Sequence, residues 1–466
     1  MVQYWCKRVI KTVGRPWVEF GDIMKIQLSE HFSVSKLLRF TFPSIIMMIF
    51  TSIYGVVDGY FVSNFAGKTP FAAVNFIYPF IAVLGAFGFM FGTGGSALVA
   101  KTFGEGKAQK ANSIFSMLVY ISIGVGVVLA GLGIAFMRPI AQLLGAEGEL
   151  LENSVVYGRI ILSVLPFFML QMEFQSFFIT AEKPDIGLAV TIASGVTNMV
   201  LDALFVAVFK WGLAGAAVAT ALSQFVGGVI PLLYFSRDNT SLLRFTKFLY
   251  DGKAMLKTFT NGSSELMSNI SMSLVSMLYN AQLLKYAGEN GIAAYGVMMY
   301  VCMIFVALFI GYTIGIAPVI SYHFGAKNTD ELKSLLKKSV SIIGICSVVM
   351  LLFSLVMVSP LSEIFVGYDD DLLALTKRGF YMYSFAFLFC GMAIFGSGFF
   401  TALNDGVTSA LISFLRTVLF QVAAVLILPL IWGIDGVWIS LVVAELMAMV
   451  TCGAFAVIKR NKYNYY

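Results

Sequence analysis

The sequence predicts an all-α polytopic membrane protein, with about twelve transmembrane helices in two six-helix lobes related by a parallel pseudo-two-fold repeat. Three observations carry this prediction. Of the 466 residues, 59% are hydrophobic and 12% are charged, and the mean hydropathy is +0.87, whereas a soluble domain carries about twice that charged fraction. Apolar runs of about 20 residues, each long enough to cross a bilayer as a helix, recur along the chain. The chain also repeats itself at one fixed offset.

The apolar runs are predicted to be helices, because the bilayer core offers the backbone no water and only helices and closed barrels can span it. The runs lack the two-residue alternation of barrel strands. In chain order, the first six predicted spans are 38–65, 71–98, 112–137, 154–178, 186–209 and 212–235. The last six are 258–284, 292–320, 335–358, 377–401, 407–431 and 434–458.

The lysines and arginines predict the orientation of these spans. Most of the 31 basic residues fall in the terminal segments and in every second loop, and such loops face the cytoplasm. We therefore expect a multi-pass protein of the plasma (inner) membrane with both termini in the cytoplasm. This bias accounts for the net charge of +6, so a nucleic-acid partner is not expected.

The internal repeat has an offset of 221 residues and needs no gap. Glycine, proline and tryptophan recur at this offset, which indicates duplication of a six-span unit. The matches include Gly94 with Gly315, Gly104 with Gly325, Pro139 with Pro360, Gly158 with Gly379, and Trp211-Gly212 with Trp432-Gly433. Six spans leave both halves in the same orientation, and parallel repeats of this kind are a transporter architecture.

The repeat and the charged segments predict the domain organisation. We expect a cytoplasmic N-terminal extension over 1–35, an N-lobe over 36–235, a cytoplasmic linker over 236–257, a C-lobe over 258–458 and a cytoplasmic tail over 459–466. In the extension, apolar residues alternate with basic ones. This pattern fits either an amphipathic helix on the inner leaflet or a disordered basic tail.

The candidate site consists of polar residues inside the spans of the N-lobe. An Asp near the centre of a membrane helix costs about 3 kcal/mol to insert, so it marks a functional site by default. Asp58 and Asp202 each lie about 10 Å from the outer end of a span, counted at 1.5 Å per residue. Asn198 lies one helical turn from Asp202, Thr220 lies at a similar depth in the next span, and Tyr157 opens the fourth span.

This layer suits two kinds of cation chemistry. Hard oxygen ligands from Asp58, Asn198, Asp202 and Thr220 can bind Na⁺. Alternatively, two carboxylates in a low-dielectric medium resist being ionised together, so one can hold a proton near neutral pH. A purely structural role, in which Asp202 caps a helix break or bonds Asn198, is the third interpretation. The C-lobe lacks the layer, because Ala423, Leu419 and Leu441 stand at the repeat positions.

Other polar residues in the spans are candidates for a substrate cavity or a gate. Glu265 and Asn269 lie early in the seventh span, and Arg416 lies early in the eleventh. We expect Glu265 and Arg416 either to form an ion pair or to face the cavity. Glu173 and Glu445 have no partner at matching depth. Gln171 and Gln175 either line the cavity or serve as packing groups between helices.

Three segments resemble the multidrug and toxic compound extrusion (MATE) family. They are FTFPSIIMMIFTSIYGVVDGYFVSNFAG at 40–67, GTGGSALVAKTFGEGKAQKAN at 92–112, and TNMVLDALF followed by GLAGAAVATALS in the fifth and sixth spans. The resemblance covers about 36–458. It implies a V-shaped transporter in which first-lobe acids bind a coupling cation, H⁺ or Na⁺.

Residue by residue, the resemblance places Asp58, Asn198, Asp202 and Thr220 at that cation site, with Tyr157 nearby. It expects a further polar residue in the fourth helix or early in the fifth, which has no clear match here and for which Gln171 and Gln175 are the candidates. It also expects an acid in the seventh helix, where Glu265 is the candidate. A second acid expected in the tenth helix is missing, since 377–401 contains no Asp or Glu. This departure favours a cation site in the first lobe.

Together these observations predict a cation-coupled antiporter that exports amphipathic, cationic organic compounds by alternating access. We expect it to be a monomer in the lipid bilayer, with H⁺ or Na⁺ as coupling ion and with no cofactor. The alternative is a flippase for lipids or lipid-linked sugars, but few basic residues lie inside the spans to bind a pyrophosphate. An enzyme is not expected, because the five cysteines and the two histidines, His31 and His323, form no metal-ligand or nucleophile motif.

Overall fold

The computed structural model describes residues 26–465, with the side chains of Lys68 and Ser273 left out. The part of the extension on which the amphipathic-helix prediction rests, 1–25, lies outside the described residues. Residues 26–33 are irregular, and the first described helix, α2, begins at Val34. Its N-cap is Ser33, whose side chain accepts a hydrogen bond from the backbone N–H of Lys36, as N-cap serines do.

The first half of the chain forms seven α-helices and two π-helical turns. In order they are α2 (Val34–Phe61), η1 (Val62–Ala66), α3 (Lys68–Gly104), α4 (Ala108–Leu143), α5 (Gly148–Ser163), α6 (Leu165–Thr180), α7 (Pro184–Asp202), η2 (Ala203–Val208) and α8 (Gly212–Ser236). An irregular linker, 237–251, follows α8.

The second half begins with α9 (Gly252–Gly325), which contains a non-helical residue, Gly288, with φ 61° and ψ −150°. Glycine adopts this conformation without steric cost. The later elements are α10 (Thr329–Val366), α11 (Asp370–Ser384), α12 (Phe387–Ala402), α13 (Gly406–Phe414), η3 (Leu415–Phe420), α14 (Gln421–Trp432) and α15 (Ile434–Tyr463).

The predicted fold class is confirmed. By length and composition, nine helices in the described chain could cross a membrane, or eleven when each of two bent pairs is counted as one span. Because α9 is interrupted at Gly288, it supplies both the seventh and the eighth predicted spans. Two spans expected to be single helices are bent: α5 meets α6 at 58°, and α11 meets α12 at 46°. At the first bend Pro166 starts a new helix, since its missing N–H is tolerated there.

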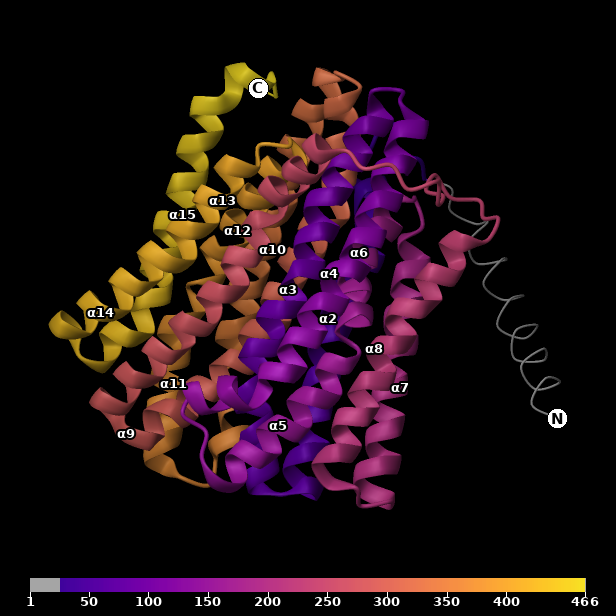
Figure 1. Cartoon of the computed structure of the whole chain (residues 1–466). Helices are drawn as coiled ribbons and strands as arrows, with labels where there is room; N and C mark the ends of the chain where they lie inside the picture. Colours follow the sequence, from indigo (N-terminus) through magenta and orange to yellow (C-terminus); the bar gives the residue numbers. More distant parts are fainter. Residues whose placement is uncertain (1–25, 466) are drawn as a thin grey trace.

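The helices form two lobes, each with its own apolar core. One core joins α3 to α8, and the other joins α9 to α15. Helices α7 and α8 lie at one outer edge of the molecule, and α14 and α15 lie at the other (Figure 1). Helix α2 contributes to both lobes: Leu37, Phe40 and Met47 pack into the C-lobe core, whereas Val62, in the π-helical turn that follows α2, packs into the N-lobe core.

The lobes touch through glycines near the linker. This end of the molecule, which also carries the C-terminus, is called the linker side (top in Figure 1). A Cβ added to Gly104 of α3 would lie 2.0 Å from the carbonyl oxygen of Tyr322 in α9, and one added to Gly325 would lie 2.0 Å from that of Lys101. Both distances are far below van der Waals contact, so the backbones meet there directly.

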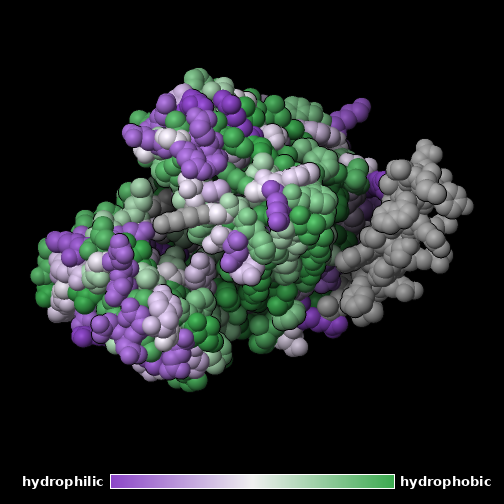
Figure 2. Space-filling model, turned by 90° about the horizontal axis from the view of Figure 1, so that it is seen from below, coloured by the Kyte–Doolittle hydropathy of each residue, from purple (hydrophilic) through white to green (hydrophobic). Residues whose placement is uncertain are grey.

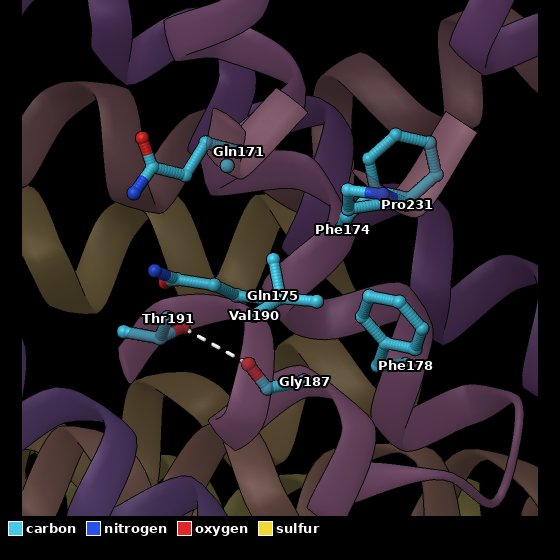
Figure 3. Close-up of a pocket in the computed structure, with 9 residues that line it drawn as sticks. Gln171, Phe174, Gln175, Phe178, Gly187, Val190, Thr191 and Pro231 are labelled. Carbon is cyan, nitrogen blue, oxygen red and sulfur yellow. Dashed lines mark hydrogen bonds between the residues drawn. The ribbon is translucent and has the colours of Figure 1, made fainter. Parts of the chain in front are cut away.

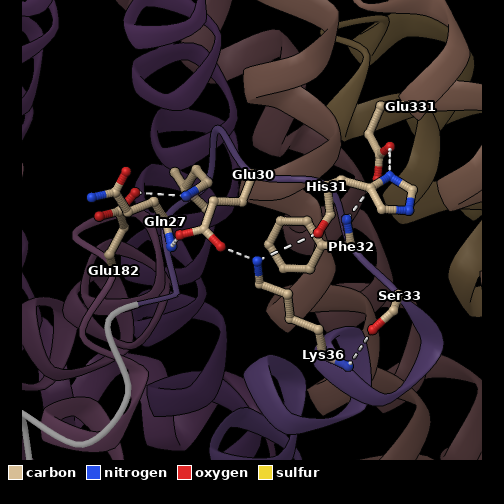
Figure 4. A network of polar contacts seen from close by, with 9 residues as sticks. Gln27, Glu30, His31, Phe32, Ser33, Lys36, Glu182 and Glu331 are labelled. Carbon is tan, nitrogen blue, oxygen red and sulfur yellow. Dashed lines mark hydrogen bonds and ion pairs between the residues drawn. The ribbon is translucent and has the colours of Figure 1, made fainter.

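A short strap, residues 26–33, also bridges the lobes on the linker side. The backbone N–H of Leu28 donates to Glu182 Oε1 (2.6 Å), in the loop between α6 and α7 of the N-lobe. The backbone N–H of Phe32 donates to Glu331 Oε1 (3.0 Å), in α10 of the C-lobe, and His31 Nδ1 lies 2.6 Å from Glu331 Oε2. Figure 4 shows these contacts on either side of Glu30.

The opposite side of the molecule is open. Seen from below, the two lobes are parted by a hollow (Figure 2). The structure therefore combines lobes closed together on the linker side with lobes spread apart on the other side.

Candidate functional site

The polar layer predicted in the N-lobe comes together in the structure. Thr220 of α8 donates from its hydroxyl to Asp58 Oδ1 of α2 at 3.4 Å. Asn198 of α7 donates from its amide to the Thr220 hydroxyl, also at 3.4 Å. Asp202, one turn beyond Asn198, interacts electrostatically with Asp58. Three helices thus supply one site of two carboxyl groups, an amide and a hydroxyl.

Several oxygens of this site have no hydrogen-bond partner. Asp202 is fully buried and Asn198 is almost fully buried. Neither carboxylate oxygen of Asp202, nor the amide oxygen of Asn198, has a partner among the described residues. Buried polar atoms are normally satisfied, so these three oxygens form an acceptor-rich cluster that a proton or a small cation would complete.

The two acids lie where α-helix changes to π-helix. Asp202 is the last residue of α7, and η2 follows directly. Asp58 lies in the last turn of α2, directly before η1. Turns of π-helix are uncommon and occur frequently at functional sites. The sequence carries no simple signal for them, and the repeat counterpart of η2 in the C-lobe is α-helical.

Three tyrosines surround the acids. Tyr157, which the sequence predicted, is buried and interacts with Asp58, Asp202 and Thr220. Tyr54 and Tyr78 also interact with Asp58, and sequence analysis missed them. Tyr54 was recognisable, because it precedes Asp58 by four residues and therefore shares its helix face. Tyr78 comes from α3 and carried no such signal.

Gln171 and Gln175 lie inside the N-lobe, not in the hollow between the lobes. They line a small cavity between α6, α7 and α8, together with Phe174, Phe178 and Thr191 (Figure 3). Gln171 donates to Ser194 Oγ at 3.1 Å. The amide oxygen of Gln171 and both amide atoms of Gln175 have no partner among the described residues. Of the two interpretations given above, their position favours packing between helices of the N-lobe over lining of the cavity between the lobes.

The C-lobe holds an ion pair that the sequence analysis did not find. Arg416, in η3, pairs with Glu445 of α15, with Nη2 to Oε1 at 2.9 Å and Nε to Oε2 at 2.9 Å. The predicted pairing of Arg416 with Glu265 is wrong, although the two interact electrostatically, and Glu445 is not a lone acid. Asn269 donates to the backbone oxygen of Glu265 at 2.9 Å, as a helix-surface amide can.

The described residues contain no group of three or more His, Cys, Asp or Glu side chains that could hold a metal ion. A transition-metal centre thus has no ligand set in this part of the chain. Na⁺ differs, because carboxylate, amide and hydroxyl oxygens are suitable ligands for a hard cation. The layer of Asp58, Asn198, Asp202 and Thr220 offers that donor set.

The family model MatE matches the chain twice, over residues 43–204 and 266–426. The chain is similar to the multidrug export protein MepA of Staphylococcus haemolyticus, with 27% identity over 424 residues that cover 89% of this chain and 92% of the relative. It is also similar to MepA of Staphylococcus aureus strain MRSA252, with 24% identity over 416 residues that cover 88% of this chain and 90% of the relative.

Solved structures share the fold. A crystal structure of MATE in complex with MaL6 superposes with a TM-score of 0.89 at 19% identity, covering 94% of this chain and 98% of that chain. An outward-facing multidrug resistance MATE family transporter of the MOP superfamily gives 0.88 at 20% identity, with the same coverage. One of the two MatE matches lies in the N-lobe and the other in the C-lobe, as expected for a duplicated six-span unit. The chain belongs to the MatE family, the multidrug and toxic compound extrusion family of membrane transporters.

Proposed function

We propose that this protein is a cation-coupled antiporter that exports amphipathic, cationic organic compounds by alternating access, with H⁺ or Na⁺ bound at Asp58, Asn198, Asp202 and Thr220. The observation that carries the proposal is the buried layer in which Asp58 and Asp202 interact while three acceptor oxygens stay unpartnered. Two ionised carboxyl groups in such surroundings are costly, so the site favours a bound proton or Na⁺.

Helix α2 offers a route from this site to the movement of the lobes. Its linker-side half packs against the C-lobe, where Gly315 of α9 approaches Thr41 and Gly311 approaches Ile45. Asp58 lies 13 residues beyond Ile45, or about 20 Å along a helix. Pro43 lies inside α2, and a proline within a helix removes a backbone hydrogen bond and allows a bend. Cation binding at Asp58 would therefore reposition the helix that both lobes share.

The substrate proposal follows from charge. Arg416 is engaged by Glu445, so it does not neutralise Glu265 by direct pairing. Glu265 is half-buried, and a cationic compound is the partner that such a carboxylate favours. The same pairing weighs against a lipid-linked pyrophosphate, which would need an available arginine. The names of the multidrug export relatives are consistent with organic substrates.

The remaining parts of the proposal are location and assembly. We place the linker side in the cytoplasm of a plasma-membrane protein, because basic residues concentrate there. The hollow seen in Figure 2 then faces outward. We propose a monomer that needs no cofactor and carries out no enzymatic reaction, since transport requires only the coupling ion and the exported compound.

The test is efflux of a fluorescent cationic dye from proteoliposomes under an imposed pH gradient or an imposed Na⁺ gradient. Asp202→Asn should abolish gradient-driven efflux. If Na⁺ is the coupling ion, Thr220→Val should weaken its binding at least about tenfold, because a hydroxyl ligand is lost and a polar interaction with a charged group is worth roughly 1.5–3 kcal/mol. The matched controls are Asp185→Asn, at the other end of α7, and Thr197→Val, whose hydroxyl bonds only its own helix.

The efflux assay distinguishes the proposed antiporter from the flippase. Efflux driven by one gradient and lost in Asp202→Asn identifies the ion and supports the site. Normal gradient-driven efflux by Asp202→Asn would contradict the mechanism. Absence of gradient-driven efflux for several cations in the wild type would contradict the antiporter proposal and favour the flippase, to be tested next with a lipid-linked substrate.

A further inference from the structure

The linker between the lobes is bound along the side of α4. The backbone N–H of Arg244 donates to Asn112 Oδ1 at 2.8 Å, and that of Thr246 donates to Ser116 Oγ at 2.8 Å. Phe245 stacks on Phe115 with ring centroids 5.1 Å apart. An irregular segment is therefore attached to a membrane helix, with side chains of that helix satisfying its backbone.

The linker is attached to α4 at the level of the boundary between the hydrocarbon core and the headgroups of the membrane. Helix α4 has 36 residues, or about 54 Å at 1.5 Å per residue, for a hydrocarbon core of about 30 Å. A centred helix leaves about 12 Å, roughly eight residues, outside the core at each end. Ser116 lies eight residues from the start of α4. Tyr120, next to Phe245 and Phe248, then lies where aromatic residues gather in membrane proteins.

The outer surface at the end of the linker and the start of α9 is apolar. Phe248, Leu249, Tyr250 and Leu256 have exposed fractions of 53%, 67%, 64% and 67%. Four large apolar side chains within nine residues form a patch that a purely aqueous surface would disfavour. No other described segment packs on this patch closely enough to bury it.

The same segment is positively charged. Lys247 and Lys253 are exposed, and neither forms an ion pair with a described carboxylate. The acid of the segment, Asp251, is compensated: its side chain accepts from the backbone N–H groups of Lys253 and Ala254 at 3.1 Å, and Lys110 lies 3.5 Å from it. Those interactions hold the pKa of Asp251 below its ordinary value. The patch therefore carries apolar groups and uncompensated lysines side by side.

From this combination we infer that residues 247–256, which comprise the end of the linker and the start of α9, form a binding site for anionic phospholipid in the leaflet on the linker side. Phe248, Leu249, Tyr250 and Leu256 enter the boundary between headgroups and acyl chains, and Lys247 and Lys253 bind the lipid phosphate and the anionic headgroup. Apolar burial combined with lysine attraction is the general basis of interfacial membrane binding. The linker is thereby a lipid-bound element that moves with α4.

The test uses full-length protein in detergent and two lipids with a fluorophore on the acyl chain, a phosphatidylglycerol and a phosphatidylcholine. Lys247→Gln/Lys253→Gln should weaken phosphatidylglycerol binding roughly 10- to 30-fold, since each lysine near an anionic surface contributes about fivefold, and should change phosphatidylcholine binding little. The matched control is Lys333→Gln/Lys337→Gln, two exposed lysines on the linker side of α10, for which less than a twofold change is expected.

A second variant separates the apolar contribution. Phe248→Ser/Leu249→Ser should weaken the binding of both lipids. Millimolar inorganic phosphate should not displace phosphatidylglycerol, which distinguishes a lipid site from a phosphate site. All variants change exposed side chains, and unchanged thermal unfolding would show that they fold.

The inference is overturned if the wild type binds both lipids equally, or if the two lysine pairs have equal effects. Displacement by phosphate alone would also overturn it. None of these outcomes depends on dye efflux, so they are independent of the proposed transport function.

Discussion

Gly104 of α3 and Gly325 of α9 make the same contact with opposite lobes. A Cβ on Gly104 would lie 2.0 Å from the carbonyl oxygen of Tyr322, and a Cβ on Gly325 would lie 2.0 Å from the carbonyl oxygen of Lys101. The two glycines are counterparts at the repeat offset, and so are Lys101 and Tyr322. The pseudo-two-fold axis therefore passes between these contacts, and the linker side closes through them.

We predict that Gly104→Ala opens the linker side. The new methyl group would overlap the carbonyl of Tyr322, so the α3 and α9 backbones must separate, and the population with a closed linker side should fall at least tenfold. Spin labels at Lys107 and Lys327, both exposed on the linker side, would report the distance between the lobes after replacement of the native cysteines. Gly325→Ala should act in the same direction.

The control for this prediction is Gly124→Ala. Gly124 is a helical glycine of α4 with no neighbouring atom within 4 Å of an added Cβ, so its substitution should leave the label distance unchanged. An unchanged distance in Gly104→Ala as well would show that the contact does not close the linker side.

We predict that removing Arg416 alone destabilises the protein more than removing Arg416 and Glu445 together. Arg416→Leu alone leaves Glu445 buried without its partner, which costs about 3–5 kcal/mol for a buried pair. Arg416→Leu/Glu445→Leu removes both charges and should recover most of that loss. The measurement is the thermal unfolding midpoint in detergent, compared with Arg138→Leu, which breaks an exposed pair with Glu152. A double variant no more stable than the single one would refute this account.

We predict that docking of the strap (26–33) depends on pH through Glu182. Burial raises the pKa of Glu182 above its ordinary value of 4.5, although the N–H of Leu28 opposes the shift and Lys183 and Glu30 also act on it. The docked state thus favours protonated Glu182, so docking is strongest below pH 4.5 and weakens as the pH rises to the raised value. Glu182→Gln keeps an acceptor for Leu28 and should remove this weakening.

Glu30 gives strap docking the opposite dependence on pH. The hydrogen bond with Lys36 lowers the pKa of Glu30 below its ordinary value of 4.5. Ionised Glu30 therefore stabilises the docked strap above pH 4.5, and this stabilisation is lost as the pH falls through the lowered pKa. Glu331 acts in the same direction as Glu30, because, although burial opposes the shift, the N–H of Phe32 and the His31 ring lower its pKa. In Glu182→Gln only these losses at acid pH should remain. A spin label at Ser29, which is exposed, would report strap mobility. If mobility in the variant still rose with pH above 4.5, another group would control the strap.

Much of the fold was predictable because apolar length and composition determine it. All twelve predicted spans coincide with helices, since a segment of about 20 apolar residues has few alternatives in a bilayer. The site was predictable for a related reason. Asp58 and Asp202 are costly in apolar spans, and equal depth in neighbouring helices brings such residues together.

Packing details were not predictable from one chain. Depth counting suggested Glu265 as partner for Arg416, but depth does not specify which face of a helix points to which neighbour. Glu445, from α15, occupies that place. The bend at Val164 and the π-helical turns after Asp58 and Asp202 depend on tertiary contacts, and local propensity does not encode them.

The pairing of Arg416 with Glu445 has a consequence for biosynthesis. An isolated helix that carries Arg416 would pay about 2.5–3.5 kcal/mol to enter the bilayer. Only Gly433 separates α14 from α15, so the acid arrives on the very next segment to be translated. The two segments are thus suited to leave the translocon together as a helical hairpin, with the guanidinium and the carboxylate already neutralising each other.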